Sequence, residues 1–388
     1  MRLYSVSRFW LVAGCIGLVV LGLLIGLAAA FVGLNQAENL FEVVSLIRSN
    51  YIEEVNLKQL LNGATKGIVD SLDDPYSVYL EPKLYKHLKE QIRGSFGGLG
   101  IVVGMRDDQL TVIRPFPDTP AGRAGIKAGD VIVKIGEREV EGLDLETAVN
   151  LMRGPVGTKV TLTIMRHGSN PLRVTLNREE ISVPSVEGKL LPEKIGYISV
   201  AQFTEKTPRE LDGVINNLKA RGMRAVILDL RDNPGGELYA AVAVADYFVP
   251  RGPVVYVKYR GGREEVHKAD AYRLSLPLVV LVNENSASAA EIVAGAIKDT
   301  RTGVVIGTRT FGKGVVQTVY DLGNGAGLKL TTAKYLTPKR RDINKKGVEP
   351  DVKVEQPVDD NTDRQLSAAQ ERLIKDLSEH ALPNAAGE

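Results

Sequence analysis

The longest apolar run of the sequence lies at its N-terminus. Residues 9–34 carry no charged side chain, and Arg2 and Arg8 precede them. As an α-helix this run would be roughly 39 Å long, and the hydrocarbon core of a bilayer is about 30 Å thick. Because signal-peptide cores usually have only about 7–15 apolar residues, the run favours a retained membrane anchor, although Ala28–Ala30 leaves cleavage open. The preceding arginines predict a single-pass protein of the cell membrane, with its bulk outside the cytoplasm.

The next segment, residues 36–93, has the apolar spacing of α-helices. Residues 38–50 and 56–71 place apolar side chains three and four positions apart, as in Leu57, Leu61, Ala64 and Ile68. This period predicts a small helical segment.

Residues 94–178 show short β-rich runs. Leu110–Ile113, Val131–Ile135 and Val160–Ile164 are rich in β-branched residues, and glycine-containing turns separate them. One helix is expected near residues 144–152. The pattern predicts a small, β-rich domain.

Residues 179–355 alternate strand-like and helix-like runs. Ala225–Leu230 leads through Asn233-Pro234-Gly235-Gly236 into a helix-like run over residues 237–248. Leu278–Val282 leads through Ser288 into a second such run. Repeated strand-turn-helix units with glycine at the turns predict an α/β layered domain. A tail, residues 356–388, opens polar and then holds a candidate helix over 363–377.

Composition narrows the functional classes. The net charge is +2, from 49 basic and 47 acidic residues, so charge gives no case for binding nucleic acid. The single cysteine excludes an internal disulfide, and the four histidines lack metal-ligand spacing. We therefore expect neither a metal nor an organic cofactor.

Ser288 stands where a strand-like run meets a helix-like run. A hydroxyl there faces unpaired N–H groups and the positive end of the helix dipole. Ser288-Ala289-Ala290-Glu291 alone fits a helix-capping box, and Ser286 is a neighbouring candidate. Lys313, in the turn Thr310–Gly314, alone would be read as a surface lysine. A serine nucleophile with a lysine base is a known variant of the catalytic triad of serine proteases.

Six motifs, in this order, resemble the carboxyl-terminal processing peptidases, also called tail-specific proteases. Each motif is weak by itself, but their common order between about residues 41 and 354 is specific. The motifs are Asp74-Pro75-Tyr76-Ser77-Val78-Tyr79-Leu80, Gly97-Gly98-Leu99-Gly100-Ile101, Asp229-Leu230-Arg231-Asp232-Asn233-Pro234-Gly235-Gly236, Ser286-Ala287-Ser288-Ala289, Gly312-Lys313-Gly314 and Gly347-Val348-Glu349-Pro350-Asp351.

The resemblance implies a ClpP/crotonase-like α/β protease core with an inserted PDZ domain. It implies that Ser288 is the nucleophile, Lys313 its base and Gln317 the group that orients the lysine. It also implies that the N–H groups of Gly235 and Ala289 stabilise the oxyanion. Lysine acts as a base at neutral pH only if its pKa is lowered, and its uncharged flanks Phe311, Gly312, Gly314 and Val315 suit such an environment.

The position of Gln317 requires a distortion of the chain. Four extended residues span about 13 Å, so Gln317 can reach Lys313 only if the chain bends or bulges at Gly314.

In the β-rich domain, Gly98-Leu99-Gly100-Ile101 resembles the carboxylate-binding loop of a PDZ domain. The strand that follows would pair with a peptide, whose apolar side chain would lie between Ile101 and a helix carrying Thr147, Ala148 and Leu151. Arg153 resembles an arginine that senses ligand and contacts the protease domain. The plain alternatives are a glycine-rich turn and a solvated arginine at a helix C-terminus.

The expected activity is therefore cleavage of protein substrates near free, apolar C-termini, in a bacterium. A Ser-His-Asp hydrolase, an acyl-CoA enzyme of crotonase type and a membrane-tethered PDZ adaptor are the alternatives. No G-x-S-x-G motif surrounds Ser288, and every catalytic position is filled, which argues against the first and the last. Residues 41–71 and 363–377 are candidates for forming a homodimer.

Overall fold

The computed structural model describes residues 38–166, 170–270, 274–357, 360 and 362–381. Between Tyr79 and Leu80 the chain divides into two units. The predicted membrane-spanning run, residues 9–34, lies outside the described residues. Within the described ranges no helix is both long enough and apolar enough to cross a bilayer.

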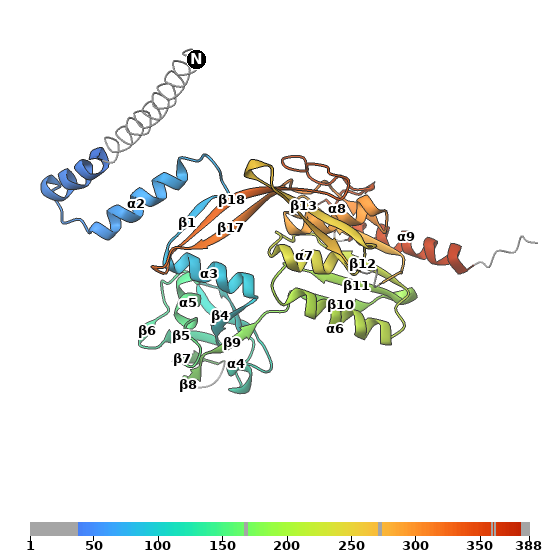
Figure 1. Cartoon of the computed structure of the whole chain (residues 1–388). Helices are drawn as coiled ribbons and strands as arrows, with labels where there is room; N and C mark the ends of the chain where they lie inside the picture. Colours follow the sequence, from blue (N-terminus) through green and yellow to red (C-terminus); the bar gives the residue numbers. More distant parts are fainter. Residues whose placement is uncertain (1–37, 167–169, 271–273, 358–359, 361, 382–388) are drawn as a thin grey trace, which may run out of the picture. The chain divides into compact units, whose positions relative to one another are not determined.

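The described part of the first unit is mostly helical, as the sequence predicts (Figure 1). Residues 38–50 form one helix, and α2 spans Leu57–Asp70. The Asn56 side chain caps α2 by accepting a hydrogen bond from Lys58 N–H at 2.9 Å. Much of the apolar surface of this unit is exposed, including 72% of Phe41 and 93% of Ile52. β1, Val78–Leu80, crosses the division between the units.

Within the second unit, a small β-domain is inserted into a larger α/β core. The chain enters it from α3, Pro82–Arg93, through β2, Ser95–Gly98, and leaves it through β9, Glu179–Ser182. β2 and β9 pair as antiparallel strands, so the entry and exit of the inserted domain lie side by side.

The inserted domain is an antiparallel sheet with the strand order β3-β4-β5-β7-β8, and β6 pairs with β5. Leu110, Ile132, Leu162 and Ile164 fill its core and are at most 1% exposed. The bounds of its elements are β3, Ile101–Arg106; β4, Gln109–Pro115; α4, Pro120–Arg123; β5, Val131–Ile135; β6, Arg138–Glu139; α5, Leu145–Met152; β7, Lys159–Met165; and β8, Leu172–Asn177.

The central sheet of the core has the order β10-β11-β12-β15-β16-β19, in which β10 is antiparallel and the other neighbours are parallel. Apolar side chains of α6, α7 and α8 pack on one face, and those of α9 pack on the other. The bounds are β10, Val186–Leu190; β11, Ile195–Val200; α6, Thr207–Ala220; β12, Ala225–Asp229; α7, Leu238–Ala245; β15, Leu278–Val282; α8, Ala289–Thr300; β16, Val304–Gly307; β19, Val352–Lys353; and α9, Arg364–Ala381.

A second sheet, which is antiparallel, contains β17, the strand that begins two residues after Lys313. Its paired strands include β17 with β18, β18 with β13, and β13 with β14. Their bounds are β13, Gly252–Tyr259; β14, Glu264–Ala269; β17, Val315–Asp321; and β18, Gly327–Leu336. Short 3₁₀ turns span Pro192–Lys194 and Arg260–Gly262.

The predicted strands at residues 225–230 and 278–282 are confirmed as β12 and β15. Both consist of buried residues throughout, because helices cover both faces of the sheet. The two strands are adjacent and parallel, so their carboxyl ends meet at one edge of the sheet. This arrangement brings the Asn233–Gly236 turn next to Ser288.

Candidate active site

Ser288 lies at the N-cap of α8 in a conformation that is rare for a residue with a side chain. Its φ is 55° and its ψ is −113°. Such a backbone costs about 1–3 kcal/mol and needs support from its surroundings. Glu291 Oε2 accepts a hydrogen bond from Ser288 N–H at 2.8 Å, and the Tyr335 hydroxyl donates to Ser288 O at 3.0 Å. Burial, with the nearby Glu291 carboxylate, raises the pKa of Tyr335 well above its usual range, so this hydroxyl stays a donor.

Ser286 has a different environment from Ser288. It is fully buried, its hydroxyl donates to Leu230 O at 2.7 Å, and it accepts from Asn283 N–H at 2.9 Å. The Ser286 side chain therefore fastens the loop to the end of β12.

Gly235 packs so closely against the Ser288 loop that only a glycine fits at this position. Its φ is +98°, and a Cβ added to it would lie 2.8 Å from Ser288 Cβ and 2.9 Å from Ala289 N. Ala289 is the first residue of α8, where an N–H has no acceptor within the helix. The structure thus places the two predicted oxyanion donors next to Ser288.

Asn233 organises the turn before Gly235. It is fully buried, and its side-chain amide donates to Val200 O at 2.7 Å. Its Oδ1 accepts from Gly235 N–H at 2.8 Å, and its backbone oxygen accepts from Ala287 N–H at 2.9 Å. The Asn-Pro-Gly-Gly turn is therefore bonded directly to the loop that carries Ser288.

Glu291 joins the serine loop to the lysine loop. Its side chain is fully buried. Oε2 accepts from the N–H groups of Ser288 and Lys313, both at 2.8 Å. Oε1 accepts from Thr310 Oγ1 at 2.6 Å and from Gly312 N–H at 2.8 Å. One carboxylate thus holds both predicted catalytic residues by their backbones.

Sequence reasoning missed this role of Glu291, because the capping-box motif accounts for its bond to Ser288 and for nothing beyond it. A usable signal was present: Glu291 is a lone charge in the apolar run Ala289-Ala290-Glu291-Ile292-Val293. A carboxylate buried in such a run needs several donors, and those donors come from residues 310–313.

Lys313 lies in a tight loop and its side chain is half-buried. Gly312 on one side has φ +89°, and on the other side a Cβ at Gly314 would lie 2.5 Å from Asn344 N. Of its uncharged flanking residues, Gly312, Gly314 and Val315 are buried, whereas Phe311 is 57% exposed.

Gln317 lies on β17, which begins at Val315. The predicted distortion exists but is displaced from Gly314, since the register of β17 against β18 shifts between Val316 and Gln317. The Gln317 side-chain amide donates to Val315 O at 3.4 Å.

The predicted carboxylate loop connects β2 to β3. Leu99 is buried, Leu99 O accepts from Ala121 N–H at 3.0 Å, and Gly100 O accepts from Phe116 N–H at 2.9 Å. β3, which starts at Ile101, lies at the edge of its sheet. This edge offers a ladder of backbone groups to an added strand.

One part of the predicted peptide groove is wrong. Ala148 on α5 is fully buried in the core of the inserted domain, so it cannot contact a ligand. Ile101, Thr147 and Leu151 are half-buried and retain accessible surface.

Arg153 follows α5, and its guanidinium lies 4.1 Å from the centre of the Phe96 ring. It borders a cavity of about 470 Å³ that is lined by parts of α3, β2 and the α/β core. The lining residues are His87, Glu90, Gln91, Gly94, Ser95, Phe96, Arg153, Val183, Pro184, Ser185, Ala201, Gln202 and Thr204.

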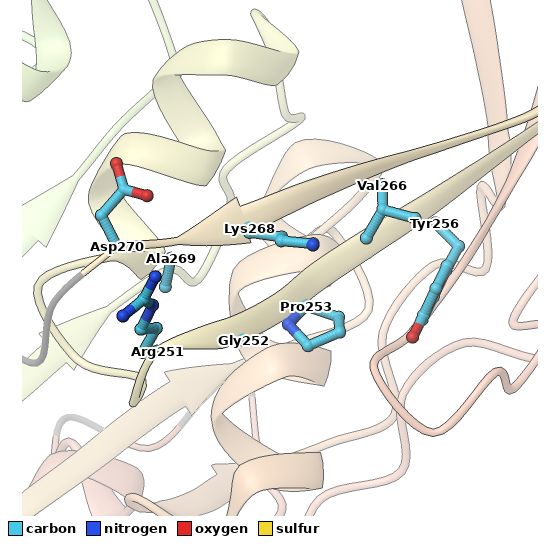
Figure 2. A pocket seen from close by; sticks show the side chains of 8 residues that line it. All are labelled: Arg251, Gly252, Pro253, Tyr256, Val266, Lys268, Ala269 and Asp270. Atoms are coloured by element: carbon cyan, nitrogen blue, oxygen red, sulfur yellow. The ribbon is translucent and has the colours of Figure 1, made fainter.

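A separate cavity of about 460 Å³ opens on the hairpin of β13 and β14 (Figure 2). The charged side chains of Arg251, Lys268 and Asp270 line it, and Tyr256 lies farther along the hairpin from Arg251 and Asp270. None of the predicted site residues lines it.

Comparison with known proteins assigns the family. The sequence matches Peptidase family S41 over residues 194–354, a PDZ domain over 89–165 and the activating protease CtpB N-terminal domain over 28–83. Carboxy-terminal processing protease CtpA of Bacillus subtilis (strain 168) is 38% identical over 336 residues, covering 86% of this chain and 72% of the relative. The carboxy-terminal-processing protease of Bartonella bacilliformis is 40% identical over 333 residues, covering 84% and 76%.

The structural comparison agrees. The solved photosystem II D1 C-terminal processing protease shares 32% identity with a TM-score of 0.50, covering 86% of this chain and 90% of that one. The chain therefore belongs to peptidase family S41 and is a carboxy-terminal processing serine protease with a PDZ domain.

Proposed function

We propose that the protein is a PDZ-gated endopeptidase that cuts protein substrates near free, apolar C-termini. Ser288 is the nucleophile, Lys313 the base and Gln317 the group that orients the lysine. One observation supports this assignment above the others. Ser288 touches the glycine turn at Gly235, and a single buried carboxylate, Glu291, holds the backbone N–H groups of both Ser288 and Lys313.

The chemistry follows from these positions. The neutral amine of Lys313 takes the Ser288 hydroxyl proton as Oγ attacks the scissile carbonyl, and the N–H groups of Gly235 and Ala289 bind the oxyanion. The lysine then gives its proton to the leaving amine as the C–N bond breaks. Water, deprotonated by the same lysine, attacks the acyl-enzyme, and the bond from the carbonyl carbon to Ser288 Oγ breaks as the lysine returns the proton to Oγ.

The Gly235 N–H donates to Asn233 Oδ1 in this structure. To bind an oxyanion it has to be shared with the substrate oxygen or turned toward it. One oxyanion donor is worth about a hundredfold to a thousandfold in kcat, so the direction in which this N–H points has a large effect on activity.

Cleavage of an unstructured peptide with an apolar tail tests the catalytic roles. Ser288→Ala and Lys313→Ala are each expected to abolish cleavage. Lys346→Ala is a matched control, because Lys346 is exposed in the loop that faces the lysine turn. Full activity of either catalytic variant contradicts the assignment, and loss of activity only on mutation of a histidine favours a Ser-His mechanism.

Three features support the proposal that the PDZ domain gates the protease. They are the edge position of β3, the glycine loop before it, and the position of Arg153 beside a cavity that the core also lines. A peptide can shift the enzyme toward activity only if it binds the active arrangement more tightly than the resting one. Amidating the C-terminus of the substrate removes the charge that the loop would hold and should lower turnover sharply. Arg153→Ala should reduce activation by added tail peptides. Equal cleavage of amidated and free-acid substrates would show that the PDZ domain is not a gate.

The membrane anchor and the extracytoplasmic location rest on the run at residues 9–34 and the arginines before it. Fractionation of cells and N-terminal sequencing of the mature protein test them. A mature N-terminus near Phe31 indicates cleavage and release instead.

Formation of a homodimer through the first unit is supported by its exposed apolar side chains, such as Phe41 and Ile52. Sedimentation of wild type and of Phe41→Ser over a range of concentrations tests it. A monomer at all concentrations contradicts it.

A further inference from the structure

The segment that carries Gly235 is hydrogen-bonded on one side to the Ser288 loop and on the other side to the start of α9. Arg231, four residues before Gly235, makes the second connection. Its guanidinium is mostly buried and lies between two carboxylates. Asp229, at the end of β12, accepts from Arg231 Nη2 at 2.6 Å. Asp363, directly before α9, accepts from Nη1 at 2.8 Å and from Nη2 at 2.9 Å.

The ion pair between Arg231 and Asp363 has two hydrogen bonds, a geometry that fixes an arginine in orientation as well as in position. The carboxylates outweigh the opposing effect of burial and raise the pKa of Arg231, so it stays charged. Asp229 alone would balance the charge. The second carboxylate comes from a residue 132 positions away and ties α9 to the strand end.

Asp363 is itself held firmly. Its Oδ1 accepts from Leu366 N–H at 2.9 Å, so it caps the first turn of α9. Gln365, in the same turn, is buried, and its amide donates to Val354 O at 2.8 Å. Ala369 and Leu373 of α9 are fully buried against the sheet. The position of Asp363 is thus set by the packing of α9.

A path of bonds continues from Arg231 to the reactive serine. Asp232, with φ 57°, is held by the side chains of Asn283 and Asn285, both at 2.8 Å. Asn233 then bonds Gly235 N–H and Ala287 N–H. A polar cavity of about 570 Å³ borders Arg231 and Asp229, so water has room to replace a lost ion pair and the turn has room to move.

We propose that α9 positions the oxyanion turn, with Asp363 as a positioning residue that acts through Arg231 on Gly235. This inference rests on the proposed function of Gly235. It predicts that weakening the contact between α9 and Arg231 lowers catalysis without lowering substrate affinity, because oxyanion donors act mainly in the transition state.

Asp363→Asn in the full chain is the decisive variant. Asparagine caps a helix as well as aspartate does, so α9 is retained while the charge and one acceptor oxygen are lost. We expect kcat to fall about tenfold with KM unchanged, which is less than the loss of a whole oxyanion donor. Labelling of Ser288 by a fluorophosphonate should slow by a similar factor, and Asp363→Glu should recover part of the rate.

Asp376→Asn is the matched control, because it removes an aspartate of the same helix that pairs with Arg372, one turn earlier in α9. It should leave kcat and labelling unchanged. If Asp363→Asn lowers the urea midpoint but keeps kcat and the labelling rate, α9 has a purely structural role and the inference is wrong. If Ser288→Ala is still active, the proposed function itself fails, and the two failures are thereby distinguished.

Discussion

Replacing Glu291 by glutamine tests the geometry of the site with a change of almost no volume. The carboxylate accepts four hydrogen bonds, two on each oxygen. A glutamine amide keeps one oxygen, and its nitrogen donates instead of accepting. With the nitrogen in the Oε2 position, the N–H groups of Ser288 and Lys313 both lose their acceptor. With the nitrogen in the Oε1 position, Gly312 N–H loses its acceptor, and the Thr310 hydroxyl can rotate to accept.

The second placement of the amide is the less costly one, so it sets the expected loss in the free energy of unfolding. One buried donor without a partner costs about 1–3 kcal/mol, and the remaining bonds lose the strength that a charged acceptor gives them. Removing a buried charge recovers part of its desolvation cost. We expect Glu291→Gln to lower the free energy of unfolding by about 2–4 kcal/mol, from the balance of these effects. Catalysis should fall at least tenfold, since the loops of Ser288 and Lys313 lose their common support.

Urea unfolding followed by circular dichroism measures the first effect, and hydrolysis of an apolar-tailed peptide measures the second. Glu284→Gln is the matched control, because Glu284 lies in the loop that leads to Ser288, is exposed and accepts a bond from Thr308 Oγ1 at 3.0 Å. It should be neutral in both assays. A Glu291→Gln variant as stable and as active as wild type would show that Glu291 does not support the two loops.

Three further predictions concern the close glycine contact, the PDZ domain and the absence of a metal from the mechanism. Gly235→Ala should abolish activity, because its Cβ would clash with Ala287 O and Ser288 Cβ at 2.8 Å; Gly222→Ala, with φ +86° and open space around it, should lose stability in urea but keep activity. Burial alone would raise the pKa of Asp130, but hydrogen bonds from Arg166 and from Lys127 N–H hold it below the ordinary 3.8. The stability that Asp130 contributes is therefore present above about pH 4 and is lost as the pH falls through its lower folded-state pKa; hydrogen exchange of the β7 amides should show this loss in wild type and not in Asp130→Asn. EDTA should leave peptide cleavage unchanged, since a serine–lysine mechanism needs no metal-bound water, and inhibition that zinc reverses would contradict it.

The sequence predicts well those features that depend on neighbouring residues. The strands at 225–229 and 278–282 were identifiable because both faces of a parallel sheet are apolar. The position of Ser288 at the start of a helix was predictable, because a strand-like run, the serine and a helix-like run follow each other closely in the sequence. The glycines around Lys313 likewise indicated a tight loop.

Features that join distant segments were not predictable. The bonds of Glu291 to residues 310–313, and those of Arg231 to Asp363, depend on how the layers pack, and no local pattern specifies them. The burial of Ala148 depends on which face of α5 meets the sheet, and helix spacing alone left this unsettled. The register shift before Gln317 arises from pairing with β18, so sequence could require a distortion without locating it.

Mass-spectrometric mapping of fluorophosphonate labelling tests the central claim most directly, because the probe reacts only with an activated nucleophile. We predict modification of Ser288 in the wild type, no labelling in Ser288→Ala, strongly slowed labelling in Lys313→Ala and a wild-type rate in Lys346→Ala. Modification of Ser286 in its place, or an unchanged rate in Lys313→Ala, would contradict the assignment of Ser288 and Lys313 as nucleophile and base.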